Sequence, residues 1–144
     1  MAWQFNGKNI EDVPSSSIGF IYKITHLPTG RWYIGRKMLT KNKTPQSKGV
    51  KNKAKVKSDW EDYWSSSELL KHLVIEHGED KFHREILLFC ETRAGLTLSE
   101  EYCLHVSGAL FDPLSLNNNI RAKIFRKWFM KTPNLFNELK KLKL

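Results

Sequence analysis

Two segments decide the fold of this chain: GFIYKI at residues 19–24 and WYIGRK at residues 32–37. In each segment large apolar side chains alternate with other residues, which is typical of a β-strand. The linker between them contains Pro28, which fixes one backbone angle, and Gly30, which permits a positive one. The two segments are therefore predicted to form a β-hairpin with one tyrosine on each strand. Tyrosine is common on strands as a packing residue, so the hairpin alone does not indicate a function.

The composition is that of one basic globular domain. The 144 residues are 40% hydrophobic and 12% aromatic, enough for a compact α/β or α+β core that needs no disulfide or metal. The net charge is +9. A positive surplus favours binding to nucleic acid, because each neutralised phosphate releases counterions.

No segment indicates a membrane or secreted protein. No apolar run approaches the roughly 20 residues that cross a bilayer, and residues 1–17 lack the apolar centre of a signal peptide. We therefore expect a cytoplasmic protein. Cys90 and Cys103 lie in apolar segments and are expected to be buried, reduced thiols. No cysteine or histidine spacing predicts zinc.

A lysine-rich segment follows the hairpin. Residues 40–58 contain no acidic residue and seven lysines: Lys41, Lys43, Lys48, Lys51, Lys53, Lys55 and Lys57. Such a block repels itself and has little apolar surface, so it is predicted to be a loop that becomes ordered against an anion, here the phosphates of a nucleic acid. The alternative is a solvated insertion without a role.

The middle of the chain is predicted to contain a helix and a third strand. Trp60 and Trp64 are four residues apart, as on one face of a helical turn that packs in the core or covers it. Ser65 opens a capping box, and the helix that follows is predicted to end at Gly78. Residues 81–90 have the pattern of a strand that is largely buried toward its end.

A second helix, predicted to begin near Thr97 and to end before Pro113, carries Glu100. Glu100 shares a face with Cys103 and other apolar residues, whereas Glu101 lies on a different face. An inward carboxylate needs a partner, and a hard divalent cation such as Mg²⁺ is one candidate. Thr97 and Glu100 also match a capping box, so Glu100 could instead close its own helix start. The residues alone favour neither interpretation.

Residues 121–144 are predicted to be a basic helical extension. Ile124 and Trp128 follow Ile120 at four-residue steps, which is typical of an amphipathic helix, and Pro133 separates it from a short final helix. The basic residues expected on this helix to contact nucleic acid are Arg121, Lys123, Arg126 and Lys127.

The hairpin as a whole resembles the signature of the GIY-YIG nuclease family, in the pair FIYKI and YIGRK. The resemblance extends over the serine-rich helix start, the third strand, the helix with Glu100 and the asparagine after it. It implies an α/β (α+β) domain over residues 1–120, with a small three-stranded antiparallel sheet flanked by helices. A lysine-rich loop before DWEDYWSSS, residues 59–67, is similar to phage-encoded members.

The resemblance also implies the site residues. Tyr22 and Tyr33 correspond to the two motif tyrosines, Glu100 to the metal-binding glutamate with Glu101 as runner-up, Asn117 to the asparagine near the end of the core, and Arg36 to the basic residue placed against the phosphate. The implied cofactor is one Mg²⁺ or Mn²⁺ ion, and the implied partner is double-stranded DNA.

One departure from the family concerns a helix arginine beyond the second tyrosine, where this chain has Lys43. A lysine neutralises phosphate as a point charge but cannot form two parallel hydrogen bonds to it. Either Arg36, Lys37 or a loop lysine takes over, or the enzyme is weak or inactive.

The expected mechanism uses Tyr22 to accept the proton of the attacking water, with Tyr33 orienting the water or phosphate. A free tyrosine has a pKa of about 10, so Arg36 and Lys37 are expected close to the ring oxygens, where they would favour the phenolate. Asn117 is expected to hold the glutamate or the backbone in place.

The leading interpretation is a metal-dependent DNA endonuclease, phage-encoded and of the homing or DNA-degrading kind. The main alternative is a nucleic-acid-binding protein that kept the nuclease scaffold but is weak or inactive, and a third is a basic structural protein. The protein is expected to be a monomer or a homodimer, since a short chain of this type cuts with low specificity or gains specificity by dimerising.

Overall fold

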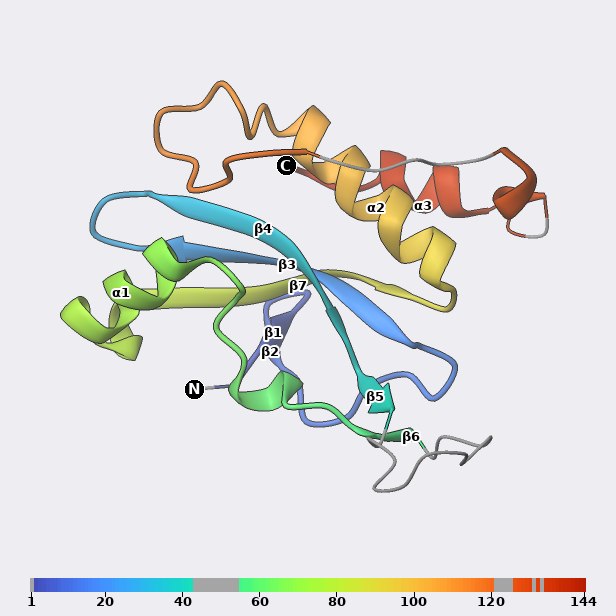
Figure 1. The fold of residues 1–144 in the computed structure, drawn as a ribbon, viewed down its shortest axis with the longest axis horizontal. Helices are drawn as coiled ribbons and strands as arrows, with labels where there is room; N and C mark the ends of the chain where they lie inside the picture. Colours follow the sequence, from blue (N-terminus) through green and yellow to red (C-terminus); the bar gives the residue numbers. More distant parts are fainter. Residues whose placement is uncertain (1, 43–54, 121–125, 131, 133) are drawn as a thin grey trace, which may run out of the picture.

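A computed structural model describes residues 2–42, 55–120, 126–130, 132 and 134–144 of the chain (Figure 1). The strands are β1 Gln4–Phe5, β2 Lys8–Asn9, β3 Gly19–His26, β4 Trp32–Met38, β5 Thr40–Asn42, β6 Lys55–Lys57 and β7 Phe82–Cys90. The α-helices are α1 Glu68–His77, α2 Arg93–Val106 and α3 Leu135–Lys140, and short 3-10 turns cover Trp60–Asp62, Glu79–Lys81 and Arg126–Phe129. No helix in these ranges is long and apolar enough to cross a membrane.

The predicted hairpin is confirmed. β3 and β4 pair antiparallel, with Tyr22 opposite Gly35 in the register. Gly30 has a φ of +75° in the turn, the left-handed conformation that glycine adopts at little cost. The predicted third strand is also confirmed, because β7 pairs antiparallel with β3 along its whole length.

The main sheet has five strands in the order β2-β1-β7-β3-β4, so the expectation of a three-stranded sheet is wrong. β1 pairs parallel with β7 at the far edge, and β2 pairs antiparallel with β1. Trp3 explains why the N-terminal segment joins the sheet. It is 1% exposed and packs edge-on against Phe20 and Tyr22, with ring centroids 5.2 and 5.4 Å away. Strands of two residues leave no periodicity in the sequence.

The two faces of the sheet carry separate cores. Phe20, Tyr22 and Ile24 point to the face covered by α1, together with Trp3. Alternate residues, such as Ile21 and Ile34, point to the face covered by α2. Figure 1 shows α2 and α3 on one side of the sheet and α1 on the other. The two cysteines lie on the α2 side as buried free thiols, as predicted, and burial raises the pKa of Cys90 to about 11 and that of Cys103 to about 12.

The helix starts differ from the predicted ones. The N-cap of α1 is Ser67, whose Oγ accepts a hydrogen bond from Leu70 N at 3.3 Å, and not Ser65, which is buried with a φ of +99°. The predicted end at Gly78 is confirmed. α2 is capped by Thr92, whose Oγ1 accepts from Gly95 N at 2.9 Å, so the helix begins well before Thr97. Glu100 therefore lies inside α2, and the capping-box interpretation of Glu100 is wrong.

The lysine-rich segment and the C-terminal extension are described only in part. Residues 40–42 and 55–57 pair as an antiparallel ribbon, where a loop was expected. The described residues of the expected basic helix form a short 3-10 turn, Arg126–Phe129. The predicted final helix is confirmed as α3, which contacts α2 and carries the buried Leu139. The predicted DNA-contacting residues outside the described ranges are Lys43, Lys48, Lys51, Lys53, Arg121 and Lys123.

Candidate active site

The two motif tyrosines lie side by side on one face of the hairpin. Tyr22 is 1% exposed, and its ring centroid lies 6.2 Å from that of the half-buried Tyr33, with the ring planes 33° apart. Gly35 makes this arrangement possible. A Cβ at Gly35 would lie 2.5 Å from Tyr22 Oη and 2.9 Å from Tyr33 Cε1. The glycine after the second tyrosine is thus required because the phenol of Tyr22 lies directly over the backbone of β4.

A third phenol, which the sequence did not predict, belongs to the same cluster. The Tyr63 ring stands edge-on to that of Tyr22, with centroids 5.9 Å apart, and the two phenols are close enough for Tyr63 to raise the pKa of Tyr22 in addition to burial. The helical spacing of Trp60 and Trp64 gave no reason to single out Tyr63, since its place depends on a 3-10 turn at Trp60–Asp62. Ser66, which also received no prediction, is close enough to Tyr33 to act on the pKa of its hydroxyl.

Both motif tyrosines are held neutral. Burial, the neighbouring phenols and the charge of Glu100 raise the pKa of Tyr22 well above its usual value. Burial is also the main cause that raises the pKa of Tyr33, although Ser66 opposes it. The expectation that Arg36 and Lys37 lower these pKa values is wrong, because neither cation is among the groups that shift them.

Glu100 of α2 lies close enough to influence the phenols and the arginine. Burial raises the pKa of Glu100, while the guanidinium and the backbone N–H of Arg36 oppose that rise. The charge of Glu100 in turn raises the pKa values of Tyr22 and Tyr33. The fold therefore brings together four of the five predicted catalytic residues, from β3, β4 and α2.

Arg36 reaches α2 from the exposed end of β4. Its Nη1 donates a hydrogen bond of 2.7 Å to Thr97 Oγ1, which lies nearly one helical turn before Glu100. The guanidinium is thereby held beside the carboxylate and still faces solvent, where an anion can approach it.

Asn117 acts on the backbone of β4, one of the two roles expected for it. Its Oδ1 accepts from Ile34 N at 3.0 Å, and its Nδ2 donates to Ile34 O at 2.8 Å. Leu116 N adds a 2.7 Å hydrogen bond to Trp32 O. The segment thus serves as a strand neighbour for the edge of β4, and it fixes the residue between Tyr33 and Gly35.

Among the described residues, no group of three or more acidic, histidine or cysteine side chains converges as a metal cage. Glu100 still fits Mg²⁺, which is usually bound through one or two carboxylates and keeps water and phosphate as its other ligands. The raised pKa of Glu100 also indicates a carboxylate whose charge the protein compensates only in part. Glu101, the runner-up, is 8% exposed and lies 3.6 Å from His105 Nε2, so it already has a partner.

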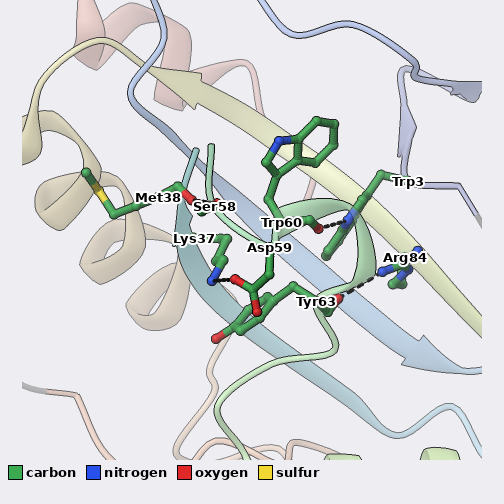
Figure 2. A network of polar contacts seen from close by, with 8 residues as sticks. All are labelled: Trp3, Lys37, Met38, Ser58, Asp59, Trp60, Tyr63 and Arg84. Atoms are coloured by element: carbon green, nitrogen blue, oxygen red, sulfur yellow. Dashed lines mark hydrogen bonds and ion pairs between the residues drawn. The ribbon is translucent and has the colours of Figure 1, made fainter. Parts of the chain in front are cut away.

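Two of the lysines predicted to contact DNA, Lys37 and Lys57, lie over aromatic rings of the segment that carries Tyr63. Lys37 Nζ lies 2.6 Å from Asp59 Oδ1 and 4.0 Å above the centre of the Tyr63 ring (Figure 2). Lys57 forms an ion pair with Glu61, and Lys41 is exposed on β5.

The C-terminal basic residues approach the site from the α2 side. Arg126 and Lys127 are exposed on the 3-10 turn that also carries Trp128. Trp128, Arg93, Ala94 and Thr97 line a cavity of about 380 Å³, and Thr97 is the residue that holds Arg36.

Comparison with known families agrees with this arrangement. Residues 3–121 match the family described as putative endonuclease segE, GIY-YIG domain. The match includes both motif tyrosines, Arg36, Glu100 and Asn117, and it ends where the basic extension begins. The chain therefore belongs to this GIY-YIG endonuclease family, and the resemblance predicted from the hairpin is confirmed. No curated protein matches the chain, and no solved structure does.

Proposed function

We propose that the protein is a metal-dependent endonuclease that hydrolyses phosphodiester bonds of double-stranded DNA with one divalent cation, Mg²⁺ or Mn²⁺. The observation that supports the proposal most is that Tyr22, Tyr33 and Glu100, from three different elements, lie close together. The charge of Glu100 acts with burial to raise the pKa of both tyrosines. Family membership supports nuclease chemistry on DNA. The likeness of residues 59–67 to phage-encoded members supports a phage origin, with a homing or DNA-degrading role.

Each residue of the site has a distinct task in this proposal. Glu100 holds the cation, which when bound supplies positive charge that stabilises the phosphate and the leaving 3′ oxygen. Arg36, kept in place by Thr97, neutralises the scissile phosphate from the solvent side. Asn117 holds the backbone of β4 in place at Ile34 through two hydrogen bonds.

Tyr22 accepts the proton of the attacking water, and Tyr33 orients that water. Burial and the neighbouring phenols raise the pKa of Tyr22 and favour the neutral phenol in the free protein. Positive charge held beside Glu100 would favour the phenolate. Among the described residues, one carboxylate, that of Glu100, influences both tyrosines, which favours a one-metal over a two-metal mechanism.

A specific observation also favours a second candidate, a weak or inactive DNA-binding protein on the same scaffold. Lys43 stands where the family has a helix arginine, and neither Arg36 nor Lys37 lowers the pKa of Tyr22. Such a protein would retain DNA through its lysines with a steep salt dependence and would not cut it.

Plasmid cutting separates the two candidates. Tyr22→Phe and Glu100→Ala are each expected to abolish cutting of supercoiled plasmid in Mg²⁺ while leaving retention in a gel shift unchanged. Tyr102→Phe is the matched control, because Tyr102 is a half-buried tyrosine of α2 outside the phenol cluster. Full activity in either site variant would reject the proposed roles, and salt-dependent retention without any cutting would support the second candidate. Sequencing the ends of partially digested DNA then gives the site preference and the number of strands cut.

A further inference from the structure

Arg84 is a buried cation of β7 with an unusual setting. It is 4% exposed, and its guanidinium lies between two indoles, 4.6 Å from the centre of the Trp3 ring and 4.3 Å from that of Trp64. Its Nη1 donates hydrogen bonds to Glu61 O at 3.2 Å and to Tyr63 O at 2.9 Å. Only a planar guanidinium can stack on both rings and donate to two carbonyls at once.

The turn that Arg84 holds is tied at two further points. Trp3 Nε1 donates to Trp60 O at 2.7 Å, and Ser58 Oγ donates to Met38 O at 2.6 Å. Figure 2 shows these contacts around the turn that links Ser58 to Tyr63. The turn is therefore fixed from the N-terminal segment, from β7 and from the end of β4.

Tyr63, at the end of this turn, packs against Tyr22 of the candidate active site. The Tyr63 ring stands edge-on to that of Tyr22, with centroids 5.9 Å apart, and it lies under the ammonium of Lys37, whose Nζ is 4.0 Å from the ring centre. The position of the Tyr63 ring thus affects both the Tyr22 ring beside it and the Lys37 ammonium above it. A displacement of about 1 Å at such a place is enough to cost about 100-fold in rate.

We propose that Arg84 is a positioning residue for DNA cleavage, which together with Trp3 holds Tyr63 so that the Tyr22 hydroxyl and the Lys37 ammonium meet the scissile phosphate correctly. The inference rests on the proposed function. It gives the N-terminal segment, which carries no reactive group of its own, a task in the reaction. In this proposal Lys37 meets the phosphate from the face of β4 that carries the phenols, whereas Arg36 meets it from the face covered by α2.

The test is a double-mutant cycle of Arg84→Met and Tyr63→Phe, with plasmid cutting in Mg²⁺ measured as a function of pH. Each single variant is expected to cut at least about tenfold more slowly, consistent with a misplaced catalytic group. Burial raises the pKa of Tyr22 most, and the neighbouring phenol of Tyr63 raises it further. Loss or displacement of that phenol should therefore move the rising limb of the pH–rate profile to lower pH in both variants. The double variant is expected to be no slower than the slower single variant, because both changes break the same coupling.

Three controls keep the outcome unambiguous. Arg31→Met removes an arginine of the hairpin turn, away from the phenols, and should leave rate and profile unchanged. Thermal melting and gel-shift retention show whether each variant is folded. Should Arg84→Met fail to fold, Arg84→Lys, which keeps the charge, and Tyr63→Phe carry the test.

If the wild type cuts DNA, either of two results overturns this inference and leaves the proposed function intact. One is an unchanged rate and pH profile in Tyr63→Phe. The other is a double variant in which the rate losses of Arg84→Met and Tyr63→Phe multiply. Absence of cutting by the wild type in both Mg²⁺ and Mn²⁺ overturns the proposed function and this inference together.

Discussion

The two faces of β4 differ in how their functional side chains are held. On one face, Tyr33 and Gly35 lie against buried aromatic rings, and Tyr22 has almost no contact with solvent. On the other face, Arg36 is exposed and is held by one hydrogen bond to Thr97. Phenols are neutral and can be packed at little cost, whereas a guanidinium pays a desolvation cost that grows with burial. The comparison indicates that the face for which we propose proton transfer is closely packed, whereas Arg36, for which we propose phosphate binding, is free to adjust.

Arg84 is the exception that sharpens this comparison. It is a cation, yet it lies on the rigid side, and burial lowers its pKa. Two indoles and two carbonyls surround it in place of water. Its location between backbone and aromatic rings suits a residue that fixes geometry, whereas the solvent-facing location of Arg36 suits a residue that meets a ligand.

The largest effect is expected for Glu100→Gln, which separates activity from stability. Charge stabilisation by a metal ion is worth several kcal/mol, so cutting should fall by about 1,000-fold or more. Burial raises the pKa of Glu100, so the folded protein binds this proton more tightly than the unfolded chain does. The stability that comes from binding this proton is fully present below the pKa of Glu100 in the unfolded chain. It is lost as the pH rises through the pKa of Glu100 in the folded protein. At neutral pH the variant should therefore be more stable than the metal-free wild type.

Thermal melting in a chelator at neutral and acidic pH checks this sign. The stability difference between Glu100→Gln and the wild type should shrink as the pH falls. A variant that is less stable than the wild type at neutral pH would show that Arg36 outweighs the cost of burial.

An intermediate effect is expected for Gly35→Ala on the phenol face. The new Cβ would meet Tyr22 Oη at 2.5 Å, and overpacking of this kind costs about 1–3 kcal/mol of folding free energy. Denaturant midpoints measure the loss. The double variant Gly35→Ala/Tyr22→Phe removes the closest atom and should lose less than the sum of the single variants. Full additivity would mean that the Tyr22 hydroxyl is not the obstacle.

The smallest effects are expected for the Lys37–Asp59 pair, which tests whether Lys37 is available to DNA. Asp59 is 67% exposed, so the pair is worth no more than about 1 kcal/mol and a phosphate can displace the carboxylate. Lys37→Met should weaken gel-shift retention and reduce the slope of affinity against salt by about 1. Asp59→Asn should act in the opposite direction and strengthen retention.

The pH dependence of retention completes this test. Lys37 holds the pKa of Asp59 below its usual value, so the pair persists throughout the neutral range and is lost only as the pH falls through that lowered pKa. The gain from Asp59→Asn should accordingly be constant at neutral pH. Weaker retention in Asp59→Asn would mean that Asp59 positions Lys37 for DNA.

The sequence by itself determined the hairpin, β7, the end of α1 at Gly78 and the family. These features rest on local alternation, on turn residues and on a motif whose members are close in the chain. The motif also places Tyr22 on β3 and Tyr33 and Arg36 on β4, and the wider resemblance places Glu100 on the helix after β7, which is α2.

Only the tertiary structure decided the partners of those residues. The approach of Tyr63 to Tyr22, the stacking of Arg84 between Trp3 and Trp64 and the addition of β1 to the sheet join residues far apart in the chain. The signs of the tyrosine pKa shifts also follow from burial and neighbouring rings, which no spacing in the sequence records. Local patterns specify elements, whereas contacts between elements depend on how their surfaces pack, and the chemistry of this site depends on those contacts.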